Sequence, residues 1–115
     1  MSFTVEISMP PSANTLFRNV RGKGRVRSAA YVKWARAAVM TIFDQVPSAN
    51  RISGRVDVEI FLPEKCRMDC DNAIKPLLDA LVTSTRIDDD RNVVRVSAWK
   101  MRSAETVLVN VTRAA

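Results

Sequence analysis

Six of the twelve acidic residues in this 115-residue chain lie between positions 69 and 90, although the formal net charge is +6. These acidic residues are Asp69, Asp71, Asp79, Asp88, Asp89 and Asp90. Crowded carboxylates repel one another unless cations neutralise them. Either the acids are spread over a solvated face, or a positive ion lies among them.

The spacing of these acids suits a divalent metal site. Asp69 and Asp71 are two positions apart, so in an extended segment both carboxylates point to the same side. Lys75 follows Asp71 by four residues, one helical turn, where it can hold a phosphate at the rim of the site. If the acids at 88–90 join them, the oxygen ligands favour Mg²⁺ or Mn²⁺ over metals that prefer thiolate or imidazole.

Each of these residues also has an ordinary structural explanation. Asp71 can cap a helix, because an acid is favoured at a helix N-terminus. Asp79 lies four residues after Lys75 and can pair with it along a helix. Three consecutive aspartates are common in a solvated turn. The full pattern, Asp-x-Asp-Asn-x-x-Lys followed by more distant acids, is a stronger signal than any one part of it.

The composition excludes several classes of chemistry. The chain contains no histidine, which excludes histidine-based nucleases, Ser-His-Asp and Cys-His enzymes, and Cys₂His₂ zinc fingers. Its two cysteines, Cys66 and Cys70, are too few for a disulfide framework, and we expect both to be reduced thiols. Any hydrolysis must therefore use carboxylates, lysine and a metal ion.

A basic segment precedes the acids. Residues 18–27, RNVRGKGRVR, contain five basic residues and no acid: Arg18, Arg21, Lys23, Arg25 and Arg27. Such a segment is typical of a surface that binds nucleic-acid phosphates. The ordinary alternative is a solvated loop made flexible by its glycines. We predict that the segment is a loop and that these five residues bind DNA.

Periodicity predicts the elements that must position these residues. Alternating apolar residues indicate strands over 3–9 and 54–63. Two further strands are expected over 92–102 and 105–112, paired as a hairpin through residues 103–104. One helix is expected from the N-cap Ser28 to about Val46, before Pro47. A second helix is expected from Asp71 or Asn72 to about Thr83, with Pro76 in its first turn or so.

The order β-α-β-α-β-β predicts an α+β fold, with a mixed sheet packed by two helices. A length of 115 residues fits one domain covering residues 1–115. The second helix would be about 18 Å long at 1.5 Å per residue. The chain must therefore fold back along it, through residues 84–87, if the two groups of acids are to meet.

No membrane segment is expected. The longest apolar runs fall far short of the ~18 residues that a membrane-spanning helix needs. The first residues show neither the basic nor the apolar part of an export signal. We expect a cytoplasmic protein without a membrane partner.

Together these residues resemble the RusA-type Holliday-junction resolvases of bacteria and their phages. The likeness begins with PPSAN, residues 10–14, and continues through the basic segment and YVKWA, residues 31–35. It is most specific in DCDNAIK (69–75), LLDAL (77–81) and DDDRNVV (88–94).

The resemblance implies roles for individual acids. Asp69, Asp71 and Asp90 match the acids with which the family binds metal and cleaves. Lys75 matches the active-site lysine of the family. Asp89 matches the acid that commonly precedes the last catalytic one, which makes it a further candidate metal ligand.

The resemblance also extends the predicted DNA-binding set. Asn14, within PPSAN, and Arg67, just before Asp69, are added to the basic segment. Family members often have a denser basic run ahead of Asp-x-Asp, where this chain has Met68. No role is assigned to Asp88.

The implied activity is that of an endonuclease, a crossover junction phosphodiester hydrolase that uses Mg²⁺ or, as a substitute, Mn²⁺. It would resolve four-way DNA junctions by paired symmetric nicks, in recombination and repair. Such a junction is nearly two-fold symmetric, so protomers with one site each would make both cuts as a homodimer. The alternatives are a non-catalytic, structure-selective DNA-binding protein, a nuclease for other branched DNA, and a small scaffold protein.

Overall fold

A mixed sheet and two α-helices make up most of the chain in the computed structural model, which describes residues 1–11, 17–66, 69–102 and 104–114. The strands are β1 (Ser2–Ile7), β2 (Phe17–Val20), β3 (Gly24–Arg27), β4 (Val56–Pro63), β5 (Val93–Met101) and β6 (Val107–Arg113). The α-helices are α2 (Ala29–Gln45) and α3 (Cys70–Thr83), and the short 3₁₀ helices are η1 (Ser48–Asn50) and η2 (Asp90–Asn92). The predicted α+β class is confirmed.

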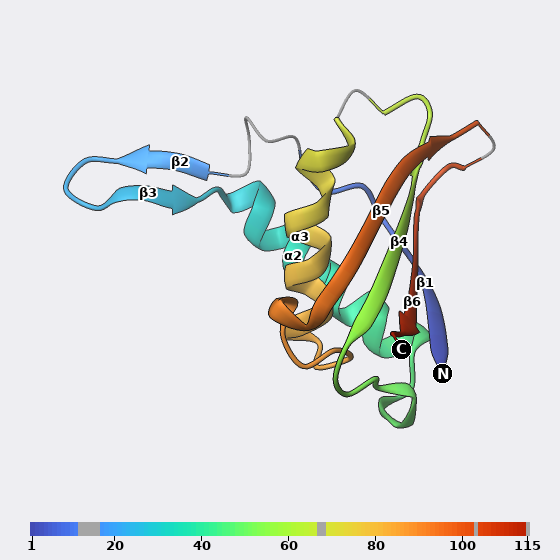
Figure 1. The fold of residues 1–115 in the computed structure, drawn as a ribbon. Coiled ribbons are helices and arrows are strands. Elements are labelled where there is room, and N and C mark those ends of the chain that lie inside the picture. The colour runs from blue at the N-terminus through green and yellow to red at the C-terminus, as the bar shows by residue number, and fades with distance from the viewer. Residues whose placement is uncertain (12–16, 67–68, 103, 115) are drawn as a thin grey trace.

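The four-stranded sheet has the order β1-β6-β4-β5 (Figure 1). β6 pairs antiparallel with both β1 and β4, whereas β4 and β5 pair in parallel. Parallel neighbours need a crossover connection, and α3 supplies it between β4 and β5. This connection packs α3 against β5, the strand that follows it.

The predicted hairpin between the last two strands is wrong. β5 and β6 pair with opposite sides of β4 and are separated by it. The central position of β6 buries Val107, Val109 and Val111. Turn-forming residues between two strands do not reveal whether a remote strand will lie between them. Here the buried valines favour a central place for β6, next to β4 and away from β5.

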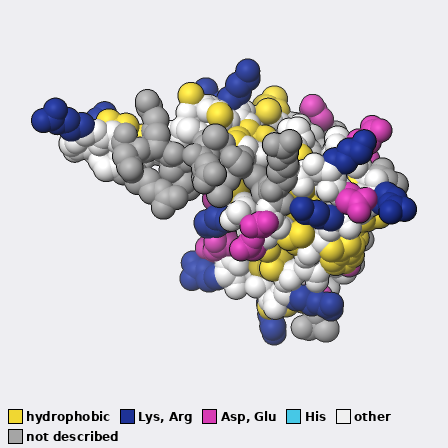
Figure 2. Space-filling view, turned by 90° about the horizontal axis from the view of Figure 1, so that it is seen from above, with side chains coloured by type: hydrophobic (Ala, Val, Ile, Leu, Met, Phe, Trp, Pro, Cys, Tyr) yellow, Lys and Arg dark blue, Asp and Glu magenta, His cyan; other side chains and the backbone are white. Residues whose placement is uncertain are grey.

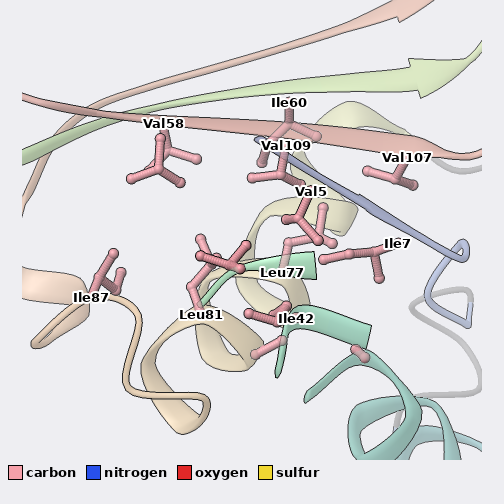
Figure 3. Close-up of a cluster of buried hydrophobic side chains, with 14 of the residues drawn as sticks. Val5, Ile7, Ile42, Val58, Ile60, Leu77, Leu81, Ile87, Val107 and Val109 are labelled. Carbon is pink, nitrogen blue, oxygen red and sulfur yellow. The ribbon is translucent and has the colours of Figure 1, made fainter. Parts of the chain in front are cut away.

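Both helices pack on one face of the sheet and form the core with it. Val109 pairs with Val5 on one side and with Ile60 on the other, which gives a continuous apolar row across three strands. Ile42 from α2 and Leu77 from α3 point at this row (Figure 3). Burial of each such side chain contributes about 1.5–3 kcal/mol.

Helix α2 begins where the sequence predicts. The Ser28 hydroxyl accepts a 3.1 Å hydrogen bond from the backbone N–H of Tyr31, and Ser28 is the N-cap. Tyr31, Trp34 and Ile42 are buried against the core. The helix ends before Pro47 because proline offers no backbone N–H to continue it.

Helix α3 begins earlier than predicted, and Pro76 is not in its first turn. With Cys70 as the first helical residue, Pro76 is inside the second turn. The Asn72 carbonyl, four residues earlier, therefore has no N–H from residue 76 to accept. The helix tolerates this because Pro76 and Leu77 are buried against the rest of the protein.

The basic segment, predicted as a loop, forms an antiparallel hairpin of β2 and β3. Its turn contains Gly22 at φ 81° and Gly24 at φ 73°, a backbone region that glycine adopts without a Cβ penalty. The Lys23 N–H donates to the Val20 carbonyl at 3.0 Å and closes the turn. The hairpin extends away from the sheet as an arm (Figure 1).

Neither α2 nor α3 has both the length and the apolar character that a membrane-spanning helix needs. Cys66 and Cys70 are not joined in a disulfide.

Candidate functional site

The first two predicted acids lie at the N-terminus of α3. Asp69 is the N-cap, with an extended backbone at φ −68° and ψ 147°, and Asp71 is in the first helical turn. Within the described residues, the Asp69 carboxylate makes no capping hydrogen bond. Both aspartates are exposed. Their carboxylates are therefore accessible to a ligand from solvent.

After α3 the chain reverses through a Schellman motif. The Thr85 N–H donates to the Val82 carbonyl at 2.9 Å, and the Arg86 N–H donates to the Leu81 carbonyl at 3.2 Å. Thr85 has a φ of 62°, a left-handed conformation that is uncommon for a β-branched residue. The sequence predicted a return of the chain here, but its lack of glycine hid the type of cap.

Buried contacts hold the returning segment in place. The Arg86 side chain is 6% exposed and donates from Nε to the Val46 carbonyl at 2.9 Å, at the end of α2. Its guanidinium lies 5.1 Å from the centroid of the Phe43 ring. Ile87 is buried and forms a parallel bridge with Ile52. These contacts of Arg86 and Ile87 therefore fix the position of the backbone from which the three aspartates at 88–90 continue.

The loop acid Asp90 returns to α3. Lys75 Nζ lies 3.2 Å from Asp90 Oδ2 and 2.9 Å from Asp79 Oδ1. Hydrogen bonds to Asp79 and then to Asp90 raise the pKa of Lys75. The lysine is therefore an ammonium ion at neutral pH, one helical turn after Asp71 and in contact with Asp90.

The other two loop acids have partners elsewhere. Asp88 pairs with Arg51 and accepts a 2.9 Å hydrogen bond from the Gly54 N–H. That N–H, followed by the Arg51 side chain, lowers the pKa of Asp88. Asp89 caps η2 by accepting from the Arg91 N–H at 3.1 Å.

The structure brings some of the predicted site residues together. It joins Asp90 to Lys75 and places Asp69 and Asp71 at the N-terminus of the helix that carries Lys75. Among the residues that the structure describes, no three His, Cys, Asp or Glu side chains form a group that could hold a metal ion. The assignment of metal ligands stays a prediction.

Three predicted DNA-binding side chains are exposed on the arm: Arg21, Lys23 and Arg27. Basic side chains project from the far end of the arm (Figure 2). Arg18 and Arg25 are in its strands, but their side chains lie outside the described part of the chain. Asn14 and Arg67 also lie outside the described residues.

A groove of about 690 Å³ is lined by residues of both α2 and α3. Arg27, at the base of the arm, lines one part of it, and Asp89 and Asp90 line another. Tyr31 and Asp79 lie between them, and the Tyr31 hydroxyl donates to Asp79 Oδ2 at 3.4 Å. The sequence predicted the Lys75–Asp79 pair from its spacing, but nothing in the sequence linked Tyr31 to the site.

Comparison with known proteins supports a common origin. A family model described as endodeoxyribonuclease RusA matches residues 8–112. A curated relative, the crossover junction endodeoxyribonuclease RusA of Escherichia coli, is 26% identical over 100 residues. That region covers 87% of this chain and 83% of the relative. These matches confirm the resemblance and the enzyme class, and the chain belongs to the RusA family of endodeoxyribonucleases.

Proposed function

We propose that this protein is a Mg²⁺-dependent Holliday-junction resolvase, which cuts four-way DNA junctions by paired symmetric nicks. The observation that carries the proposal is the 3.2 Å contact between Lys75 and Asp90. It brings an acid from a separate loop to the helix that carries Asp69 and Asp71. The name of the Escherichia coli relative, a crossover junction endodeoxyribonuclease, supports a branched DNA substrate.

The chemistry of the acids fits Mg²⁺. Asp69, Asp71 and Asp90 offer exposed carboxylate oxygens, the hard ligands that this ion prefers. We assign the ion to these three residues, with Asp89 as a further ligand. In this structure the Lys75 ammonium neutralises the Asp90 carboxylate, and a bound metal cation would neutralise it instead. When bound, such an ion lowers the pKa of a water molecule and offsets charge on the phosphate.

The basic side chains would hold the substrate. The Lys75 side chain is 69% exposed, so its ammonium can contact the phosphate that is cut. Arg21, Lys23 and Arg27 would bind neighbouring phosphates along the arm, which gives affinity without sequence choice. Recognition would then depend on the shape of the branched DNA.

The proposal includes a homodimer. Each chain carries one set of these acids, and a four-way junction presents two symmetric phosphates. Two chains related by a two-fold axis would place one site at each of them.

The first test is Asp71→Asn, assayed with Mg²⁺ on a four-way junction labelled in turn on each arm. The amide loses the charge that attracts the cation, so we expect cleavage to fall at least about 100-fold. Junction binding, measured by gel shift in EDTA, should change by less than about threefold, because phosphate contacts supply most of the affinity. The matched control is Asp44→Asn, which makes the same charge change at an exposed position near the end of α2.

The same assay separates the alternatives. If Asp71→Asn cleaves like the unchanged protein, the carboxylate site is wrong. Tight junction binding without nicking in any divalent ion would support a non-catalytic binding protein. Faster cutting of flaps or forks than of four-way junctions would support a nuclease for other branched DNA.

A further inference from the structure

The Asp79 carboxylate joins two residues that come from different helices. Its Oδ1 lies 2.9 Å from Lys75 Nζ, within α3. Its Oδ2 accepts a 3.4 Å hydrogen bond from the hydroxyl of Tyr31, on α2. Both oxygens therefore have a partner, and the Asp79 side chain is only 29% exposed.

The two partners of Asp79 differ in burial. Lys75 has a long, 69% exposed side chain, and an exposed lysine–carboxylate pair at this spacing normally fixes its geometry weakly. Tyr31 is 3% exposed and packs beside Trp34, with ring centroids 6.3 Å apart. The Tyr31 ring is thus held in the core, and its hydroxyl gives Asp79 a partner on a buried residue.

Tyr31 also contacts the base of the arm. The Arg27 guanidinium lies 5.2 Å from the centroid of the Tyr31 ring, within the range of a cation–π interaction. A continuous series of contacts therefore runs from Arg27 through Tyr31, Asp79 and Lys75 to Asp90.

We infer that Asp79 is a positioning residue that holds the Lys75 ammonium beside Asp90 by anchoring it to Tyr31. The inference rests on the proposed function, because it gives Lys75 a role in cleavage. Asp79 itself would touch neither the phosphate nor the metal ion. Without Asp79, Lys75 would keep Asp90 as its one acidic partner among the described residues, and its ammonium would be less well placed for the phosphate.

A spectroscopic test reports on the anchor alone. Tyr31 is the only tyrosine in the chain, so absorbance at alkaline pH follows the ionisation of this one phenol. Burial, and after it the negative charge of Asp79, raise the pKa of Tyr31, while Arg27 and Lys75 oppose the shift. We expect Asp79→Asn to lower the pKa of Tyr31. Asp44→Asn should leave this pKa unchanged.

A kinetic test reports on positioning. Single-turnover cleavage of a four-way junction should slow about tenfold in Asp79→Asn, as expected for loss of a hydrogen bond to a charged group. The KM for the junction should stay within about twofold. Tyr31→Phe keeps the ring but removes the hydroxyl, and should slow cleavage in the same direction by a smaller factor.

The double variant distinguishes one series of contacts from two independent effects. If Tyr31 acts through Asp79, Tyr31→Phe combined with Asp79→Asn should be no slower than Asp79→Asn alone. If the double variant slows cleavage by the product of the two single factors, the inference is overturned. An unchanged cleavage rate in Asp79→Asn would overturn it too. Tyr31→Phe preserves the buried ring, so it can be assayed even if Asp79→Asn folds poorly. Unchanged cleavage in Tyr31→Phe would then overturn the inference.

The spectroscopic and kinetic tests also separate this inference from the proposed function. If the unchanged protein fails to cut a junction with Mg²⁺, the proposed function falls. An unaltered pKa of Tyr31 in folded Asp79→Asn, with the unchanged protein still active, would reject the anchor and leave the proposed function standing.

Discussion

At the scale of single residues, three consecutive aspartates have three different partners. Asp88 is held by Arg51 and by the Gly54 N–H, ahead of β4. Asp89 caps η2, and Asp90 reaches Lys75 on α3. Identical side chains thus serve loop stability, local capping and the candidate site. Asp88, which the sequence left without a role, is a structural residue.

The lowered pKa of Asp88 predicts a pH-dependent contribution to stability. Because the folded state favours the ionised form, the stabilisation is present above the ordinary pKa and is lost as pH falls through the lowered folded value. We expect Asp88→Asn to lower Tm by about 1–4 °C at pH 7. This difference should shrink between about pH 4 and pH 2.

Thermal melts followed by circular dichroism across this pH range check the prediction. Glu105→Gln, an exposed acid in the turn before β6, is the control. A Tm difference that persists at pH 2, or none at pH 7, would show that the Asp88 carboxylate does not stabilise the loop by its charge.

At the scale of elements, the β2–β3 arm is separate from the core. It joins α2 directly through Ser28, so a hydrogen-bonded cap fixes where the arm ends and the helix begins. Its paired strands hold basic side chains on a defined scaffold, in contrast to the predicted loop. The DNA contacts proposed for the arm and the cleavage chemistry proposed for α3 therefore lie on different elements, and they can be altered separately.

Replacing Arg21 and Lys23 with alanine should weaken junction binding without slowing cleavage of bound DNA. Each lost phosphate contact lowers the slope of log affinity against log salt by about one. Gel shifts between about 50 and 200 mM salt measure that slope. The control is Arg102→Ala, an exposed arginine after β5 that pairs with Glu64 at 3.6 Å. An unchanged slope in the arm variant would show that these two side chains do not contact phosphates.

At the scale of the whole molecule, β5 forms an open edge of the sheet. Val94, Val96 and Trp99 on it are between 37% and 43% exposed, although all three are large and apolar. An edge strand presents unpaired backbone groups that can pair with a second copy. Two β5 strands in antiparallel pairing would be related by a two-fold axis, as the proposed homodimer requires. β6, in contrast, has its valines in the core.

We therefore expect Trp99→Glu to shift the proposed dimer towards monomer, because a buried charge at an apolar interface is costly. Sedimentation velocity at several concentrations measures the shift. The matched control is Met40→Glu, which places the same charge at an exposed apolar position on α2. If Met40→Glu dissociates the dimer and Trp99→Glu does not, the interface is on α2 rather than on β5.

By itself the sequence determined what depends on residues close together. Apolar periodicity located both helices and four of the strands, Ser28 marked the start of α2, and the Asp71–Lys75 spacing identified one face of α3. Only the tertiary structure decided the position of β6 between β1 and β4, the Tyr31–Asp79 contact and the separate partners of residues 88–90. These features join segments far apart in the chain, so they depend on how the whole core packs and not on a local pattern.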